Sequence, residues 1–228
     1  MWLREFAASY FVSINRELNP KIWEGSELMP EVREKLIKIA EAFREFIAID
    51  LDVVDYTMTG SNANYTWTKY SDLDLHIIVN GEVGPEAREL FNAKKALWAE
   101  HHDITIRGLP VECYVQGENE RHHSSGVYSV MHDKWLMVPR KIKPKIDDSA
   151  VERKLDAVTH DITMAVTAGD IGRLEKMKER ITNMRKSGLE RAGEWSTENL
   201  AFKALRNMGV IDQLTNKIRE LEDQDLSL

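Results

Sequence analysis

Apolar and polar residues alternate strictly at residues 72–79, which predicts a strand with one buried and one polar face. Successive side chains of a strand point to opposite faces of the sheet. The buried face would carry Leu73, Leu75, Ile77 and Val79, and the polar face Asp72, Asp74 and His76. The pattern therefore sets two carboxylates side by side, about 7 Å apart at the backbone.

Other segments of the first half are predicted as alternating helices and strands. After Pro30, apolar residues recur at spacings of three and four, and proline suits the first turn of a helix. The β-branched and aromatic run at 53–59 predicts a strand. By the same criteria we predict helices at 3–17 and 85–101, strands at 104–107 and 111–116, and a hairpin of 126–131 with 134–138.

The second half carries four apolar stripes with helical spacing, and no strand pattern follows about residue 140. The stripes begin at Val151, Ile171, Leu200 and Ile211. Two prolines, at 139 and 144, interrupt the chain between the two halves. We predict an α/β (α+β) fold with a boundary near Asp147: an α/β domain over residues 1–146 and an all-helical domain over residues 147–228.

Composition limits the class of protein. The chain has 228 residues, 43% of them hydrophobic, and no apolar run approaches the roughly 20 residues of a membrane span. The first residues lack the basic-then-apolar order of a signal peptide, and the single cysteine, Cys113, excludes an internal disulfide. We expect a cytoplasmic protein with no membrane partner; the sequence carries no indication of its oligomeric state.

The net charge of −7 argues against a protein that tracks long nucleic acid, because such proteins carry a basic surface. Residues 134–145 are a local exception, with five basic and no acidic residues: Lys134, Arg140, Lys141, Lys143 and Lys145. The two prolines of this segment also suit a plain linker. A nucleic-acid contact and a linker both remain open for it.

A third carboxylate, Glu112, falls on the polar face of the predicted strand at 111–116, because apolar residues alternate with it. If this strand lies beside residues 72–79, Glu112 joins Asp72 and Asp74. Three carboxylates so close repel one another unless a cation lies between them. Mg²⁺ or Mn²⁺, which prefer oxygen ligands, suits such a site, and three carboxylates on one face can hold two ions.

A candidate phosphate site lies upstream, where the strand at 53–59 ends in Gly60-Ser61. Glycine lets the backbone approach a ligand closely. If a helix begins near Ser61, its free N–H groups offer an anion site, and the hydroxyl adds a hydrogen bond. A phosphate site beside a carboxylate cluster is the chemistry of nucleotide transfer.

Gly60-Ser61, ten residues, then Asp72-Leu73-Asp74, with Glu112 further on, resembles the pattern of the DNA polymerase β-like nucleotidyltransferase superfamily. The resemblance implies a small mixed-sheet nucleotidyltransferase domain. It implies that Gly60 and Ser61 hold the terminal phosphates of an NTP such as ATP. It further implies that Asp72 and Asp74 bridge two Mg²⁺ or Mn²⁺ ions, and that Glu112 binds the ion that activates the acceptor and takes the acceptor's proton.

The sequence departs from the superfamily pattern at one point. Many relatives place a basic residue directly after Gly-Ser, where this chain has Asn62-Ala63-Asn64. Lys69 is the nearest cation and is the candidate for that nucleotide contact.

The resemblance implies an enzyme that moves an NMP from an NTP to an acceptor hydroxyl and releases pyrophosphate. A small molecule, an RNA 3′ end and a protein hydroxyl remain open as the acceptor. The alternative from another class is a non-catalytic nucleotide-binding or interaction protein with a degenerate form of the same fold. The complete set of three acids, Asp72, Asp74 and Glu112, favours the enzyme.

Overall fold

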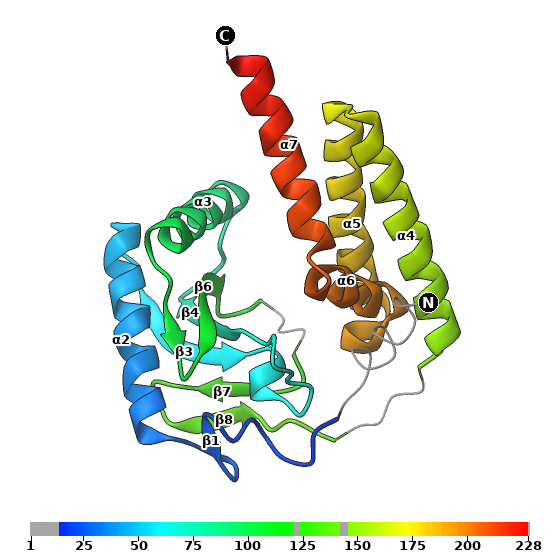
Figure 1. The fold of residues 1–228 in the computed structure, drawn as a ribbon. Coiled ribbons are helices and arrows are strands. Elements are labelled where there is room, and N and C mark those ends of the chain that lie inside the picture. Colours follow the sequence, from blue (N-terminus) through cyan, green and yellow to red (C-terminus); the bar gives the residue numbers. More distant parts are fainter. Residues whose placement is uncertain (1–13, 121–123, 142–145, 228) are drawn as a thin grey trace. The chain divides into compact units, whose positions relative to one another are not determined.

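A mixed six-stranded sheet organises the first half of the chain, with the strand order β5-β6-β4-β3-β7-β8 (Figure 1). The computed structural model describes residues 14–120, 124–141 and 146–227. The central pair β4–β6 is parallel, and the other neighbouring strands are antiparallel. The strands are β3 (Val53–Thr59), β4 (Leu73–Val79), β5 (Thr105–Ile106), β6 (Leu109–Gly117), β7 (Val127–Ser129) and β8 (Lys134–Met137).

Two helices and the apolar face of the sheet form the core of this unit. Helix α2 (Pro30–Ile47) begins with proline in its first turn, as predicted, and buries a stripe from Val32 to Ile47. Helix α3 (Pro85–His101) contributes Phe91 and Trp98. These side chains pack with the apolar face of β4, which consists of the predicted Leu73, Leu75, Ile77 and Val79.

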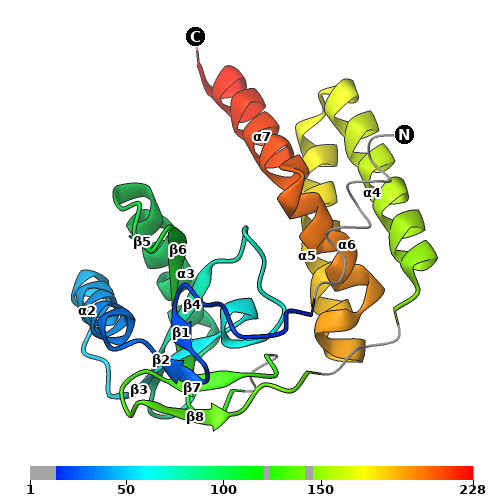
Figure 2. The same ribbon diagram turned by 60° about the horizontal axis from the view of Figure 1, so that its bottom comes forward.

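A small hairpin, β1 (Trp23–Glu24) with β2 (Glu27–Leu28), lies beside the β7–β8 edge (Figure 1, Figure 2). The Trp23 ring stacks on Trp135 at 4.7 Å and meets Tyr128 edge-on at 5.0 Å. The sequence pattern does not predict this hairpin, because strands of two residues show no alternation.

The helix predicted at 3–17 lies mostly outside the described residues, and its described part is not helical. There the backbone N–H of Asn15 donates to the Tyr65 carbonyl, and its side-chain amide donates to the carbonyls of Tyr65 and Trp67. Tertiary contacts thus supply the hydrogen bonds that a helix would have made internally.

The second half is helical, as predicted. Its elements are α4 (Asp148–Ala168), α5 (Ile171–Ala192), the short 3₁₀ helix η2 (Gly193–Trp195), α6 (Thr197–Asn207) and α7 (Val210–Leu226). The predicted apolar stripes form a separate core that includes Val151, Leu174, Leu205 and Leu214. The side chains of Asp147, Asp170 and Ser196 cap the first turns of α4, α5 and α6.

The described residues thus divide into two compact units, one within 14–141 and one at 146–227. The α/β class with a largely helical second half is confirmed; the boundary near Asp147 stays a prediction. Among the described residues, no helix combines the length and apolar character of a membrane span.

Candidate active site

Polar side chains cross one face of the sheet where β6, β4 and β3 lie together. Strand register pairs Glu112 with Asp74, and Asp74 with Thr59. Two residues further along β4 and β6, His76 pairs with Tyr114. The alternation of these three strands therefore produces a continuous polar face opposite the core.

Three carboxylates meet on this face. Each of Asp72, Asp74 and Glu112 offers one oxygen such that all three oxygens lie within 4.8 Å of one another. All three residues are partly exposed. The condition for Glu112 to join the two aspartates is met, because β4 and β6 pair in parallel with Asp74 opposite Glu112. The geometry offers an all-oxygen ligand set of the kind that Mg²⁺ and Mn²⁺ prefer.

Glu112 is held by two protein donors on one oxygen. Lys95 Nζ donates to Glu112 Oε2 at 2.7 Å, and the Tyr114 hydroxyl donates to the same oxygen at 2.6 Å. Burial by itself raises the pKa of Glu112, but the hydrogen bond and charge of Lys95, with hydrogen bonds to Tyr114 and Asp72, lower that pKa to about 2. Burial, reinforced by the nearby Asp74 and Glu112 charges, raises the pKa of Tyr114, so its hydroxyl keeps the proton that it donates.

Lys95, Tyr114 and His76 form a layered stack beside the carboxylates. The Lys95 ammonium lies 3.5 Å from the centroid of the Tyr114 ring. That ring stacks on His76, with centroids 4.9 Å apart and planes 21° apart. The His76 ring nitrogen Nε2 lies 3.2 Å from Thr59 Oγ1. These contacts fix the orientation of the side chains that border Glu112.

Gly60 lies directly against Asp74. Its φ of 75° favours glycine, and a Cβ at this position would come within 1.8 Å of Asp74 Oδ2. The backbone of Gly60 therefore lies close to the Asp74 carboxylate, and its predicted approach to a phosphate stays a prediction. No other residue fits here without moving that carboxylate.

Ser61 follows Gly60 and begins a single 3₁₀ turn, η1 (Ser61–Ala63). Its hydroxyl donates to Ser71 Oγ at 2.8 Å, and Ser71 Oγ also accepts the Thr68 backbone N–H at 2.9 Å. Ser61 is thus joined to the residue that precedes Asp72. Its predicted role as a phosphate contact stays a prediction.

Asn62, the residue after Gly60-Ser61, ties this turn to the start of β4. It is fully buried, and its amide donates to the Asp72 carbonyl at 2.7 Å. Its side-chain oxygen accepts from Asn19 at 2.8 Å, and its backbone carbonyl accepts the Trp23 indole N–H at 2.7 Å. Asn62 therefore positions the backbone that carries Asp72.

Replacing Asn62 by alanine is expected to lower the free energy of unfolding by about 2–4 kcal/mol, because the buried Asn19 amide and Asp72 carbonyl each lose a partner. The midpoint of thermal unfolding should fall by roughly 5–10 °C. Asn80→Ala is the matched control, since this exposed asparagine donates to the exposed Asp52 at 2.8 Å and should cost far less. Equal midpoints for the two variants would contradict the role of Asn62.

Lys69, the predicted cation for the nucleotide, lies on the exposed loop before Asp72. Its ammonium is 4.8 Å from the centroid of the neighbouring Tyr70 ring. The structure thus places Lys69 in the segment between Ser61 and Asp72, and its contact with a nucleotide stays a prediction.

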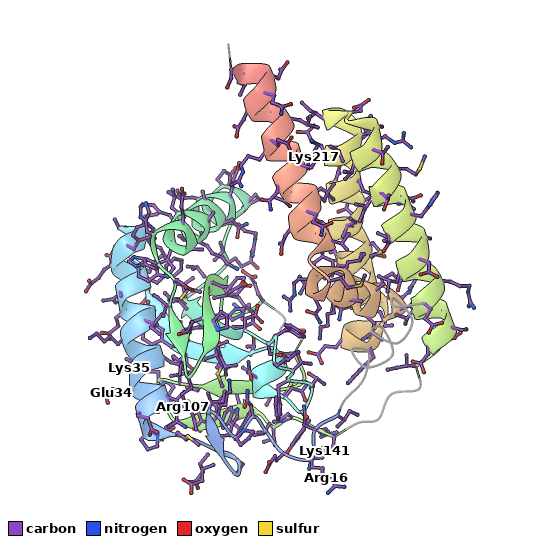
Figure 3. The ribbon with its side chains drawn as sticks, in the orientation of Figure 1. Arg16, Glu34, Lys35, Arg107, Lys141 and Lys217 are labelled. Carbon is purple, nitrogen blue, oxygen red and sulfur yellow. The ribbon has the colours of Figure 1, made fainter. Side chains whose placement is uncertain are left out.

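Part of the basic segment at 134–145 lies at residues 142–145, outside the described residues. Lys141 is described, and it donates to the Arg16 carbonyl while lying 4.6 Å from the Tyr65 ring centroid. Figure 3 shows Lys141 and Arg16 at the same edge of the α/β unit. The Lys141 ammonium thus anchors the chain near Arg16, which is a structural use of one cation of this segment.

Sequence reasoning missed three residues that contact the site: Lys95, Tyr114 and Asn62. Two of them leave a signal in the sequence. Tyr114 follows Glu112 by two residues and so shares its strand face. Lys95 lies four residues after Phe91 and three before Trp98, on the apolar stripe of α3, where a lysine requires a partner.

Comparison with known protein families gives one match. Residues 36–132 match the family described as nucleotidyltransferase domain. This range contains the glycine, the serine and all three carboxylates, so the resemblance to DNA polymerase β-like nucleotidyltransferases is confirmed for this part of the chain.

Comparison with curated protein sequences yields no match. Among solved structures, the chain is similar to the STING-associated CdnE c-di-GMP synthase from Capnocytophaga granulosa. The two are 17% identical over 89% of this chain and 70% of the synthase, with a TM-score of 0.24.

Proposed function

We propose, from the premise that residues 36–132 form a nucleotidyltransferase domain, that this protein moves an NMP from an NTP to an acceptor hydroxyl. The acceptor oxygen forms a bond to the α-phosphorus as the hydroxyl proton passes to water, the bond from that phosphorus to the bridging oxygen breaks, and pyrophosphate leaves with that oxygen. The observation that supports this reaction best is the meeting of Asp72, Asp74 and Glu112 within 4.8 Å on one sheet face.

The three carboxylates fit a divalent-metal site in their chemistry. They supply hard oxygen ligands from a rigid sheet, with Asp74 held between Gly60 and the paired Glu112. We propose that Asp72 and Asp74 hold two Mg²⁺ or Mn²⁺ ions and that Glu112 holds one of them. When bound, such ions neutralise the charge of the triphosphate and lower the pKa of the acceptor hydroxyl.

We assign Glu112 as a ligand and not as the base that takes the acceptor's proton. Its Oε2 already accepts from Lys95 and Tyr114. Burial raises the pKa of Glu112, but its hydrogen bonds lower it by more, and the ionised form that they favour is the form that binds a cation. The chain's contribution to catalysis is then the positioning of charge, which dominates phosphoryl and nucleotidyl transfer.

The triphosphate is proposed to lie along the turn at Gly60 and Ser61, next to Asp74. The missing side chain at Gly60 makes room for Asp74 beside this turn, and the Ser61 hydroxyl and backbone N–H groups supply donors. Lys69 extends from the same loop and would contribute a charge. The exchange of the Ser61 hydroxyl between Ser71 and a phosphate oxygen requires only a rotation about its C–O bond.

Three acceptors remain in this proposal. A small hydroxylated molecule accords with the net charge of −7. An RNA 3′ end requires a basic groove, to which residues 134–145 would contribute, and Lys141 is already engaged with Arg16. A protein hydroxyl needs no basic surface.

The function is tested by incubating the protein with Mg²⁺ or Mn²⁺ and each of the four α-³²P-labelled NTPs. RNA, a small-molecule extract and the protein itself serve as acceptors in separate reactions. We expect label transfer with pyrophosphate release, and we expect the Asp72→Ala/Asp74→Ala double variant to lack both. The labelled product identifies the acceptor class. Metal-dependent NTP binding without transfer under any condition would instead favour the non-catalytic binding protein.

A further inference from the structure

A lysine ammonium already neutralises part of the carboxylate cluster. Lys95 Nζ lies 2.7 Å from Glu112 Oε2, and the Lys95 side chain is 25% exposed. The Lys95 ammonium also lies 3.5 Å from the centroid of the Tyr114 ring, which favours its position. The Tyr114 hydroxyl donates to the same Oε2, so ring, carboxylate and ammonium hold one another in place. Lys95 lies on the inner stripe of α3, between Phe91 and Trp98, so this position is built into the packing of the helix.

The charge of Lys95 acts in opposite senses before and after a metal ion binds. Without an ion, three carboxylates within 4.8 Å repel one another, and the ammonium offsets one of their charges. With an ion bound by the same carboxylates, the ammonium lies beside a second cation and repels it. Lys95 therefore stabilises the metal-free protein relative to the metal-bound one.

We propose that Lys95 is a resident counter-ion of the carboxylate cluster and that it competes with divalent metal for that cluster. This inference rests on the proposed function, since it concerns ions at Asp72, Asp74 and Glu112. Lys95 thereby weakens the affinity of the protein alone for metal. The triphosphate of an NTP supplies negative charge in place of the carboxylate charge that Lys95 offsets. Metal and nucleotide therefore bind together.

The test is a titration of the protein with Mn²⁺, in which electron paramagnetic resonance reports free ion, without nucleotide. Lys95→Met keeps the apolar stem and removes the charge. We expect this variant to bind Mn²⁺ about tenfold more tightly than the unsubstituted protein, a factor that corresponds to roughly 1.4 kcal/mol. Its unfolding temperature without metal should fall, and saturating Mn²⁺ should raise it by more than in the unsubstituted protein, because ligand binding stabilises the folded state.

Two further variants separate the position of the charge from its presence. Lys94→Met removes the same charge from the neighbouring residue, whose ammonium lies near the Phe46 ring and carbonyl; Lys95→Arg keeps the charge in place. Both should bind Mn²⁺ like the unsubstituted protein. Unchanged or weaker binding by Lys95→Met would overturn the inference, as would an equal gain in Lys94→Met.

Asp74→Asn distinguishes failure of this inference from failure of the proposed function. If Asp74→Asn weakens Mn²⁺ binding and Lys95→Met does not tighten it, the carboxylates hold metal without competition, and only the inference fails. If Asp74→Asn leaves Mn²⁺ binding unchanged both alone and combined with Lys95→Met, the ion binds elsewhere, and the proposed function fails with it.

Discussion

Asp74→Asn is expected to lower the rate of NMP transfer by at least about 10³-fold, which corresponds to roughly 4 kcal/mol of lost transition-state stabilisation. Asp74 is central to the proposed ligand set: it is opposite Glu112 in the strand register and shares a cluster of ligand oxygens with Asp72. Asparagine keeps the shape of the side chain but removes the charge that would hold a divalent ion. The loss should therefore fall on the chemical step.

The measurement is the rate of label transfer from an α-³²P-labelled NTP, together with the unfolding temperature of each variant. Asp52→Asn is the matched control: it makes the same change at an exposed aspartate that accepts a hydrogen bond from Asn80. We expect the control to keep its transfer rate and both variants to remain folded. Transfer by Asp74→Asn at the rate of Asp52→Asn would remove Asp74 from the mechanism.

The strands of the site were predictable from the sequence because local alternation determines which face each side chain occupies. Residues 72–79 and 111–116 each alternate, and this pattern alone assigns Asp74 and Glu112 to polar faces. Their adjacency depends on strand order, which alternation does not contain. The structure supplies it through the parallel β4–β6 pair, within the range that matches the nucleotidyltransferase family.

Contacts between distant segments account for what the sequence did not reveal. Asn62 looks like an ordinary polar loop residue, and its burial follows from Asn19 and Trp23, about forty residues earlier in the chain. Lys95 interrupts an apolar helical stripe, which signals a buried partner. Identifying that partner as Glu112 requires the placement of α3 on the sheet, which no local pattern encodes.

The contacts of Asn62 show a structural use of the position that follows Gly60-Ser61. The local Gly-Ser pattern predicts a phosphate contact, and a cation after it would serve that contact directly. Here the position is used instead to hold the Asp72 backbone through a hydrogen bond of 2.7 Å. Under the proposed function, Lys69 and metal held by the carboxylates would supply the positive charge that a triphosphate needs.

Gly60→Ala is the second substitution with a large expected effect, because it acts on Asp74 without changing any charge. The added Cβ would lie 1.8 Å from Asp74 Oδ2 and 2.9 Å from Asp74 Cγ, so the carboxylate has to move. We expect NMP transfer to fall by about 10²-fold or more, since a displacement of about 1 Å at a reacting centre has that effect. Mn²⁺ affinity should fall as well, because the ligand set loses its geometry.

Backbone strain is the competing explanation, and Gly81→Ala separates the two. Gly60 and Gly81 have similar positive φ values, 75° and 79°, so alanine is strained at both. A Cβ at Gly81 meets nothing within 4 Å, however, whereas a Cβ at Gly60 meets the Asp74 carboxylate. Both variants should therefore unfold at lower temperature, and only Gly60→Ala should lose transfer and Mn²⁺ affinity. Normal transfer and metal binding in a destabilised Gly60→Ala protein would mean that the turn can place its phosphate contacts independently of Asp74, and that the approach of Gly60 to this carboxylate is a matter of packing alone.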